Sequence, residues 1–402
     1  MVLKSPLQLP SFRWLWLGQT FIFCAAQFWF VALTWLVLQK TGSGVALGAV
    51  LMAAAIPRGL LMLVGGVISD RFPPNAIAAI ATVINTMLSG LMTMMLVTDT
   101  FHLQVVVVIA ALFGISDAFL YPATLALLPR LIRKARLGQA NAWMQGSEQI
   151  TNVIGPAAAG LIIGTLGLTA AFAFNTTLFA IGAGCVYLLR IRHNPAIVTL
   201  EPQALTSGIV EGLNYAWKHA GIRISLLLIA MINFAILGPI VVGVAELVTV
   251  RFDADATTFG YLQSAYGIGA LLGVWIAGQM SAIKQLKTPL VLLAGVLGLG
   301  LIALGFAPHP WIAATIMMMM GMGGGIVGVL GITWLQQETV ISMQGRMMSL
   351  VMFASVALDP FSQAISGVLL EINLTGLFIA AGVTMLVTAI VSLLSQASDR
   401  SL

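Results

Sequence analysis

The chain has 402 residues, of which 59% are hydrophobic and only 8% are charged, whereas a soluble globular domain carries roughly 25% charged residues. This composition excludes a water-soluble fold and makes a lipid bilayer the expected surrounding of most of the chain. The net charge of +5 does not indicate nucleic-acid binding, because the 18 Lys and Arg residues are scattered rather than gathered into a stripe.

Apolar runs of about 20 residues, each long enough for a helix to cross the hydrocarbon layer, recur along the whole chain. They predict an all-α membrane protein with twelve transmembrane helices over 12–38, 45–68, 76–97, 103–128, 141–165, 168–190, 222–250, 257–280, 288–307, 311–336, 346–370 and 374–395. The two cysteines, Cys24 and Cys185, fall inside such runs and imply no disulfide framework.

The basic residues predict the orientation of these spans. With the N-terminus inside, fifteen Lys and Arg residues fall in inner loops or at inner helix ends, and only Lys40 and Arg251 fall outside. The positive-inside rule therefore predicts that both termini face the cytoplasm.

The longest polar interval, 191–221, divides the spans six and six. We expect an N-terminal six-helix bundle over 1–190, a cytoplasmic linker over 191–221 with a short amphipathic helix over 206–219, and a C-terminal bundle over 222–402. The two halves echo each other at offsets of 207–212 residues, which indicates a duplicated six-helix unit. Matching positions include Arg13 with Arg223, Gly48 with Gly260, Gly66 with Gly278, Gly138 with Gly345, and Gly160 with Gly367.

The stretch "GGVISDRFPPN" (65–75) places an Asp–Arg pair directly after the second apolar run. With twelve spans in two halves, it resembles the major facilitator superfamily, whose signature between spans two and three matches Gly66, Ser69, Asp70 and Arg71. The family pattern usually continues with Gly and two basic residues, whereas Pro73, Pro74 and Asn75 stand here. The resemblance implies that Gly66, Asp70 and Arg71 form a conformational latch against span eleven on the cytoplasmic side.

A second stretch, 127–163, resembles the branch that includes enterobactin exporters and drug–proton antiporters. Its "GPAAAG" looks like a partial antiporter signature in span five, carried by Gly155, Pro156 and Gly160. The resemblance implies a proton-coupled exporter in the cytoplasmic (inner) membrane of a bacterium.

Charged residues inside a bilayer are expensive, at about 2.5–3.5 kcal/mol each on insertion scales, so each one calls for a partner or a role. Arg58 and Asp117 lie at similar depth, and Asp359 is also near the middle of its span. We expect Arg58 to pair with Asp117 or Asp359 and protonation to change the pairing, with Asp117 as the preferred proton carrier. A permanent Arg58–Asp117 pair, a kink-capping role for Asp359 before Pro360, and a structural role for Glu148 stay open; Glu246 is expected to be solvated.

The family resemblance implies a central cavity lined by spans one, four, seven and ten. Aromatic, Met and amide side chains there favour an amphipathic substrate, although each also fits ordinary helix packing. The candidates are Gln27, Trp29, Phe30, Phe113, Tyr121, Asn233, Phe234, Met318, Met322 and Gln337.

We therefore expect a secondary active transporter that exports drugs or a siderophore by alternating access. It would use the proton gradient, with no cofactor and no metal, act as a monomer in the bilayer, and bind no nucleic acid. A lipid or lysophospholipid flippase on the same fold and a non-transporting receptor or scaffold are the alternatives. An enzyme is not expected, because the sequence shows no nucleophile–base or metal-ligand spacing.

Overall fold

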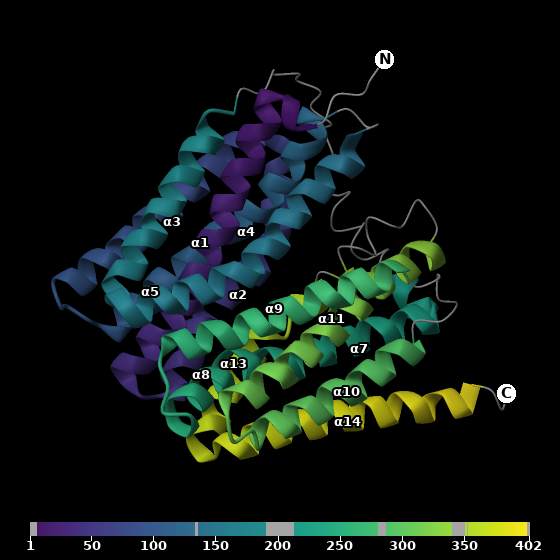
Figure 1. Ribbon diagram of the computed structural model, residues 1–402. Coiled ribbons are helices and arrows are strands. Elements are labelled where there is room, and N and C mark those ends of the chain that lie inside the picture. The colour runs from purple at the N-terminus through teal and green to yellow at the C-terminus, as the bar shows by residue number, and fades with distance from the viewer. Residues whose placement is uncertain are drawn as a thin grey trace. The chain divides into compact units, whose positions relative to one another are not determined.

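The computed structural model describes residues 6–132, 136–189, 213–279, 287–339, 350–351 and 353–399, and all regular elements in these ranges are helices (Figure 1). The predicted all-α class is confirmed. A short turn, η1 (Pro6–Gln8), precedes the first long helix. The long helices are α1 (Pro10–Thr41), α2 (Gly44–Arg71), α3 (Pro74–Val97), α4 (Leu103–Leu131), α5 (Leu137–Tyr187), α7 (Ala220–Gly238), α9 (Ala256–Gln279), α10 (Lys287–Gly305), α11 (Pro310–Glu338), α13 (Asp359–Ile372) and α14 (Leu374–Asp399).

Ten helices in the described ranges are long and apolar enough to cross a membrane. One of them, α5, contains Gly167 in the left-handed region at φ 85°, where the helix is interrupted. Glycine adopts this conformation readily because it has no Cβ. α5 therefore covers the two spans predicted over 141–165 and 168–190, and the shorter apolar helix Pro289–Gly305 covers the span predicted over 288–307. In the described ranges, helical segments thus lie within all twelve predicted spans.

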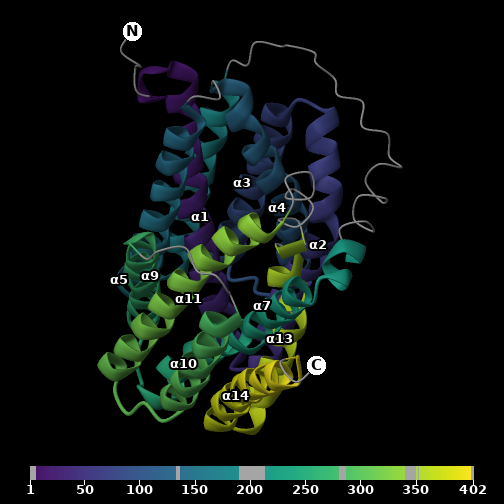
Figure 2. The same ribbon diagram turned by 90° about the vertical axis from the view of Figure 1, so that its right-hand side faces the viewer.

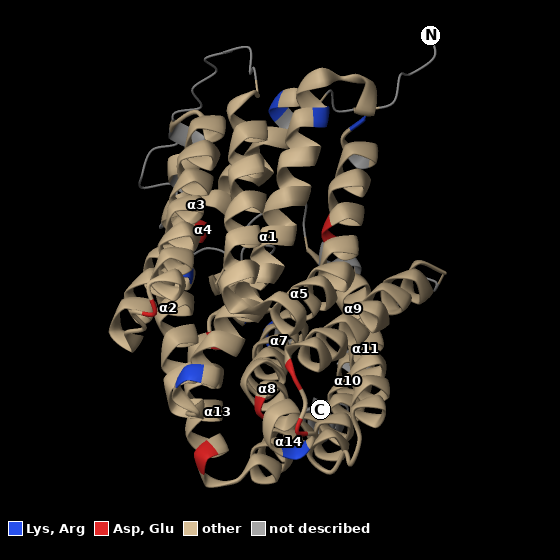
Figure 3. Ribbon diagram, turned by 60° about the vertical axis from the view of Figure 1, so that its left-hand side comes forward, with Lys and Arg blue, Asp and Glu red and all other residues tan. Residues whose placement is uncertain are grey.

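Charged residues are sparse on these helices, and most of the ribbon carries neither Lys, Arg, Asp nor Glu (Figure 3). Large apolar side chains such as Leu60, Met87 and Leu166 are exposed in the absence of lipid. Such an apolar exterior is what a protein surrounded by hydrocarbon needs.

Backbone contacts divide the chain into two compact units. Unit 1 comprises Met1–Thr41, Ala53–Thr199 and Asp255–Ser264, and unit 2 comprises Gly42–Met52, Leu200–Ala254 and Ala265–Leu402. This partition differs from the sequence halves in two short segments, 42–52 and 255–264. The division into halves at 190 and 222 stays a prediction.

In unit 1, α5 packs along α1 and α3 (Figures 1 and 2). Before Gly167 it runs parallel to α1, because Trp16 donates to Ser147 Oγ at 2.6 Å and Gln27 donates to Asn152 Oδ1 at 2.6 Å. After Gly167 it runs antiparallel to α1, so that the Phe28 and Phe174 rings lie 5.1 Å apart. The chain therefore reverses at Gly167.

Buried polar groups join α3 to α5 in the same unit. Ser89 Oγ donates to the Phe172 carbonyl at 3.3 Å and accepts from Asn175 Nδ2 at 3.1 Å and from Thr176 Oγ1 at 3.0 Å. Hydrogen bonds of this kind hold transmembrane helices together where hydrophobic burial offers no driving force between them.

In unit 2, α10 and α14 lie side by side (Figures 1 and 2). Small residues permit this approach, because a Cβ at Gly298 would lie 2.9 Å from the Gly382 carbonyl oxygen. α7 contacts α13 through Ser362, whose hydroxyl donates to the Phe234 carbonyl at 2.5 Å and accepts from the Gly238 amide at 2.8 Å.

The seventh span is not a uniform α-helix. After α7 the chain forms a π-helical segment, η3 (Pro239–Gly243), a short α-helical turn, α8 (Val244–Glu246), and a second π-helical segment, η4 (Leu247–Arg251). A π turn holds one residue more than an α turn. The offset between the repeats rises from 210 at Arg13 and Arg223 to 212 at Gly48 and Gly260. The seventh span, Ala220–Arg251, keeps the offset of 210 from α1 (Pro10–Thr41) at both of its ends, so the two extra residues lie in the loop 252–255, which corresponds to the shorter loop 42–43.

The eleventh span was predicted as one helix over 346–370, and it is interrupted. A turn at Ala357 and Leu358 separates a helical segment from α13, which begins at Asp359 and Pro360. Proline suits the first helical turn, because its missing N–H has no intrahelical acceptor there. Residues 340–349 lie outside the described ranges, as do 191–212 of the predicted linker. In the rest of the linker, 213–218 are helical and α7 begins at Ala220.

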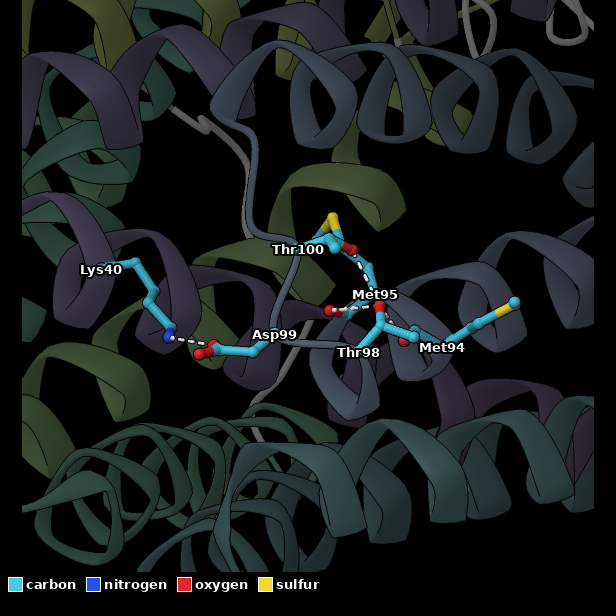
Figure 4. Close-up of polar contacts among 6 residues, drawn as sticks. All are labelled: Lys40, Met94, Met95, Thr98, Asp99 and Thr100. Atoms are coloured by element: carbon cyan, nitrogen blue, oxygen red, sulfur yellow. Dashed lines mark hydrogen bonds and ion pairs between the residues drawn. The ribbon is translucent and has the colours of Figure 1, made fainter.

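The end of α3 is closed by a Schellman-type arrangement (Figure 4). Asp99 adopts φ 49°, and the Thr100 amide donates to the Met95 carbonyl at 3.0 Å. Thr98 Oγ1 also donates to the Met94 carbonyl at 2.9 Å. Asp99 lies 3.5 Å from Lys40 Nζ, so that an exposed ion pair links the ends of α1 and α3.

Candidate functional site

An ion pair inside the predicted membrane segment is the centre of the candidate site. Arg58 Nε on α2 lies 3.2 Å from Asp117 Oδ2 on α4, within unit 1. Each residue lies fourteen positions after the start of its helix, about 21 Å along the axis. Of the two predicted acidic partners, the structure brings Asp117 to Arg58. Asp359 belongs to unit 2 and begins α13.

Two glycines set the approach of α2 to α4 around this pair. A Cβ at Gly114 would collide with the carbonyl oxygen of Ala54, and a Cβ at Gly65 would collide with that of Ala118. The helix backbones are therefore in direct contact on either side of the pair, as small residues allow in membrane bundles. The Arg58 side chain is 52% exposed and that of Asp117 is 26% exposed, so that the pair borders a surface of the unit.

Tyr121 and Glu148 complete the polar cluster. Tyr121 lies one turn after Asp117 on α4, and its phenol is within coulombic range of Glu148, Arg58 and Asp117. Glu148 is half-buried on α5, one turn before Asn152. One guanidinium, two carboxyl groups and a phenol thus gather in a part of the chain where charges are rare.

Two of the predicted cavity aromatics lie in the core of unit 1. Trp29 stacks on Phe113 with the ring centroids 4.3 Å apart and an interplanar angle of 6°. Phe172 meets Trp29 edge-on, and Phe179 meets Phe113 edge-on. Trp29 is 5% exposed and Phe113 is 9% exposed. Their neighbours fill the space around them, so that these two rings stabilise the bundle.

The other predicted lining residues of unit 1 are partly exposed. Gln27, Phe30 and Tyr121 are of intermediate burial. The amide of Gln27 donates to Asn152, which the sequence reasoning missed. Asn152 could have been found from the sequence, because it lies four residues after Glu148 and therefore on the same face of the helix.

The span-five residues Gly155, Pro156 and Gly160 mediate close packing. A Cβ at Gly155 would lie 2.6 Å from Gln27 Cβ, and one at Gly160 would collide with the Ala256 carbonyl oxygen. Pro156 presents its own carbonyl oxygen to Gly260 of α9. The glycines allow α5 to contact both α1 and α9.

In unit 2, Asn233, Phe234, Met318 and Met322 are of intermediate burial. Asn233 Nδ2 donates to the Ile229 carbonyl of its own helix at 2.9 Å. The backbones at Met318 and Met322 contact α9 where Gly269 and Gly273 have no Cβ. The side chains of Gln337, Asp70 and Arg71 and the surroundings of Gly66 lie outside the described set, so that the predicted latch stays a prediction.

The family model of the Major Facilitator Superfamily matches residues 15–358. This chain belongs to the Major Facilitator Superfamily. The predicted family is therefore confirmed, and the chain is a membrane transporter of this superfamily.

Several relatives align with this chain over most of its length. The MFS-type transporter y4rN of Sinorhizobium fredii is 26% identical over 97% of this chain and 96% of its own. The multidrug efflux pump Tap of Mycolicibacterium fortuitum is 23% identical over 90% of each chain. Macrolide efflux protein A of Streptococcus pyogenes is 22% identical over 85% of this chain and 86% of its own.

Solved transporters share the fold. A mutant of the nucleoside transporter NupG superposes with a TM-score of 0.75 at 12% identity, covering 95% of this chain and 99% of its own. A POT family transporter in complex with a thioalcohol-conjugated peptide also gives 0.75, at 11% identity, over 97% and 96%. At such identities the likeness shows the fold alone.

Proposed function

We propose that this transporter exports amphipathic, drug-like molecules in exchange for protons by alternating access. Two relatives carry efflux names, one for multiple drugs and one for macrolides. The observation that carries the proton-coupling part is the Arg58–Asp117 pair, held inside the predicted membrane segment beside Tyr121 and Glu148.

Protonation of Asp117 would remove the attraction that holds the two side chains together. Arg58 would then be a membrane-embedded cation without its partner, which is unfavourable. The lowest-energy response is a movement that brings Arg58 to water or to another carboxylate. Proton binding at Asp117 can thereby be linked to a conformational change.

Each unit supplies side chains suited to an amphipathic substrate. Unit 1 offers Gln27, Phe30 and Tyr121, and unit 2 offers Asn233, Phe234, Met318 and Met322, all of intermediate burial. Aromatic and Met side chains adapt to ligands of different shape. We leave Trp29 and Phe113 out of this set because the core of unit 1 encloses them.

We propose the cytoplasmic membrane of a bacterium as the location, with both termini inside and the chain acting as a monomer. The charge bias of the loops supports the inward placement of the termini. Export of a siderophore is a narrower form of the same proposal.

The test is macrolide transport by Asp117→Asn in vesicles with an imposed pH gradient, with and without an uncoupler. We expect gradient-driven accumulation to disappear while substrate exchange without a gradient persists. The matched control is Asp99→Asn, which removes an acid from the exposed Lys40 pair. Undiminished gradient-driven transport in Asp117→Asn would refute the proton-carrier role. Wild-type transport of fluorescent lipid but not of macrolide would refute drug export and favour the flippase alternative.

A further inference from the structure

Two close helix contacts in this protein are copies of each other. In unit 2, α2 meets α13: a Cβ at Gly48 would lie 2.8 Å from the Gln363 carbonyl oxygen, and one at Gly367 would lie 2.5 Å from that of Gly44. Because these glycines bring backbone against backbone, a small separation of the helices would open the contact.

In unit 1, α9 meets α5 in the same way. A Cβ at Gly260 would collide with the Pro156 carbonyl oxygen, and one at Gly160 would collide with that of Ala256. The repeat offsets of 212 and 207 residues map these four positions onto the four of the first contact. Duplication of the six-helix unit has therefore preserved the geometry of the contact twice.

The N-termini of α2 and α9, which lie next to the two contacts, also correspond in the two repeats. Ser43 precedes α2, and its hydroxyl accepts from the Ala46 amide at 3.2 Å; Asp255 precedes α9, and its carboxylate accepts from the Thr258 amide at 3.2 Å. Each residue is thus an N-cap of its own helix. The offset of 212 relates these two positions as well.

The contacts differ in the side chains that bridge them. In the α5–α9 contact, Thr257 Oγ1 donates a neutral hydrogen bond of 3.4 Å to the Gly160 carbonyl. In the α2–α13 contact, a carboxylate makes the bridge.

Glu371, at the end of α13, accepts a hydrogen bond from Ser43 Oγ at 2.6 Å and one from the Val45 amide at 3.4 Å. Hydrogen bonds to a charged acceptor are stronger than neutral ones, and a carboxylate is favoured at a helix N-terminus. The repeat places Gly164 at the position equivalent to Glu371, and glycine has no side chain with which to make such a bridge.

We propose that Glu371 is a lock that fastens α2 to α13 at the end of the membrane predicted to face outside. Only one of the two duplicated contacts carries this lock, so the α2–α13 contact opens less readily than the α5–α9 contact. The inference rests on alternating access in the proposed function, in which contacts at one end of the membrane must form and break. It assigns the asymmetry between the repeats to a single carboxylate.

The test measures the opening of each contact by cysteine labelling in the full-length chain in membranes, with Cys24→Ala and Cys185→Ala as background. Leu370→Cys reports the α2–α13 contact, because the Leu370 side chain packs against Gly44 of α2. Ile163→Cys is the repeat-equivalent position in the α5–α9 contact, and the two side chains are 7% and 6% exposed. The probe is a membrane-impermeant maleimide.

We expect Glu371→Ala to raise the labelling rate at 370 by on the order of tenfold, because a charge-assisted hydrogen bond is lost, and to leave the rate at 163 within about twofold. Ser43→Ala should act in the same direction. Asp255→Ala is the matched control, because it removes an N-cap but no bond between helices, and it should leave the rate at 370 unchanged. Glu371→Gln, which keeps an acceptor oxygen, should have a smaller effect than Glu371→Ala.

An unchanged rate at 370 in Glu371→Ala, or an equal rise at 370 and 163, would overturn the proposal. If Glu371→Ala does not reach the membrane, the comparison of Ser43→Ala with Asp255→Ala decides the matter: equal rates at 370 overturn the lock. The labelling does not depend on substrate or on a proton gradient. Failure of proton-coupled export therefore leaves this result readable.

Discussion

Gly114→Ala should disrupt the contact on which the Arg58–Asp117 pair depends. The new methyl group would lie well inside the 3.0 Å that real Cβ atoms avoid, against the backbone carbonyl of Ala54. A carbonyl oxygen in a helix cannot swing aside, so α2 and α4 must separate by roughly 1 Å.

That separation has two energetic consequences, of which the overpacking is the larger. Overpacking of this kind destabilises by typically about 1–3 kcal/mol. A movement of roughly 1 Å would also take Arg58 Nε beyond 4 Å from Asp117 Oδ2, compared with 3.2 Å now. At an effective dielectric constant of about 20 the attraction falls by roughly 1 kcal/mol, and less because water screens the half-exposed Arg58.

The assay is thermal unfolding in detergent, followed by tryptophan fluorescence, together with gradient-driven macrolide transport. Gly59→Ala is the matched control on α2, because a Cβ there has no atom within 4 Å. It should leave stability unchanged or slightly raised, since alanine favours the helix over glycine by about 1 kcal/mol. If Gly114→Ala melts and transports like the wild type, or if Gly59→Ala is equally damaging, the reasoning is refuted.

Further predictions concern packing elsewhere. Gly321→Ala, whose Cβ would collide with the Tyr266 carbonyl oxygen, should destabilise unit 2 by about 1–3 kcal/mol. Gly328→Ala, with open space around its Cβ, should be neutral in the same melt. Trp29→Ala should lower the free energy of unfolding by about 3–5 kcal/mol, because it empties a stacked core site. Trp311→Ala, at a residue 82% exposed, should change it by less than about 0.5 kcal/mol, and similar losses in both variants would contradict the core assignment. Lys40→Ala should cost less than about 1 kcal/mol at low salt and nothing measurable at high salt; a large effect that persists at high salt would show that the exposed pair with Asp99 has a structural role.

The twelve spans were predictable because the bilayer requires helices of a certain length and apolarity, and both properties can be read from the residue types. The pairing of Arg58 with an acid at its own depth was also within reach, because each helix advances by a fixed rise per residue. The choice of Asp117 over Asp359 was not, because it depends on which helices touch. The glycines that bring α2 against α4 have no distinctive pattern on their own helices.

The direction in which side chains face was the weakest part of the sequence reasoning. Trp29 and Phe113 look like lining residues in a list of aromatics, whereas the structure stacks them in the interior of unit 1. Aromatic residues occur on the lipid, core and cavity sides of membrane helices alike, so an aromatic residue alone does not tell these sides apart. The Ser43–Glu371 bond was out of reach for another reason, since its partners are 328 positions apart.

The π-helical stretches of the seventh span change how the two repeats must be compared. The first and seventh spans begin and end at the same offset of 210, so an alignment of the repeats needs its gap in the loop 252–255 and not in the helix. The wider π turns between positions 239 and 251 nevertheless rotate side chains relative to an uninterrupted α-helix. A mutation can therefore be transferred from the first span to the seventh by residue number, whereas the face of the helix on which it then lies must be taken from the structure.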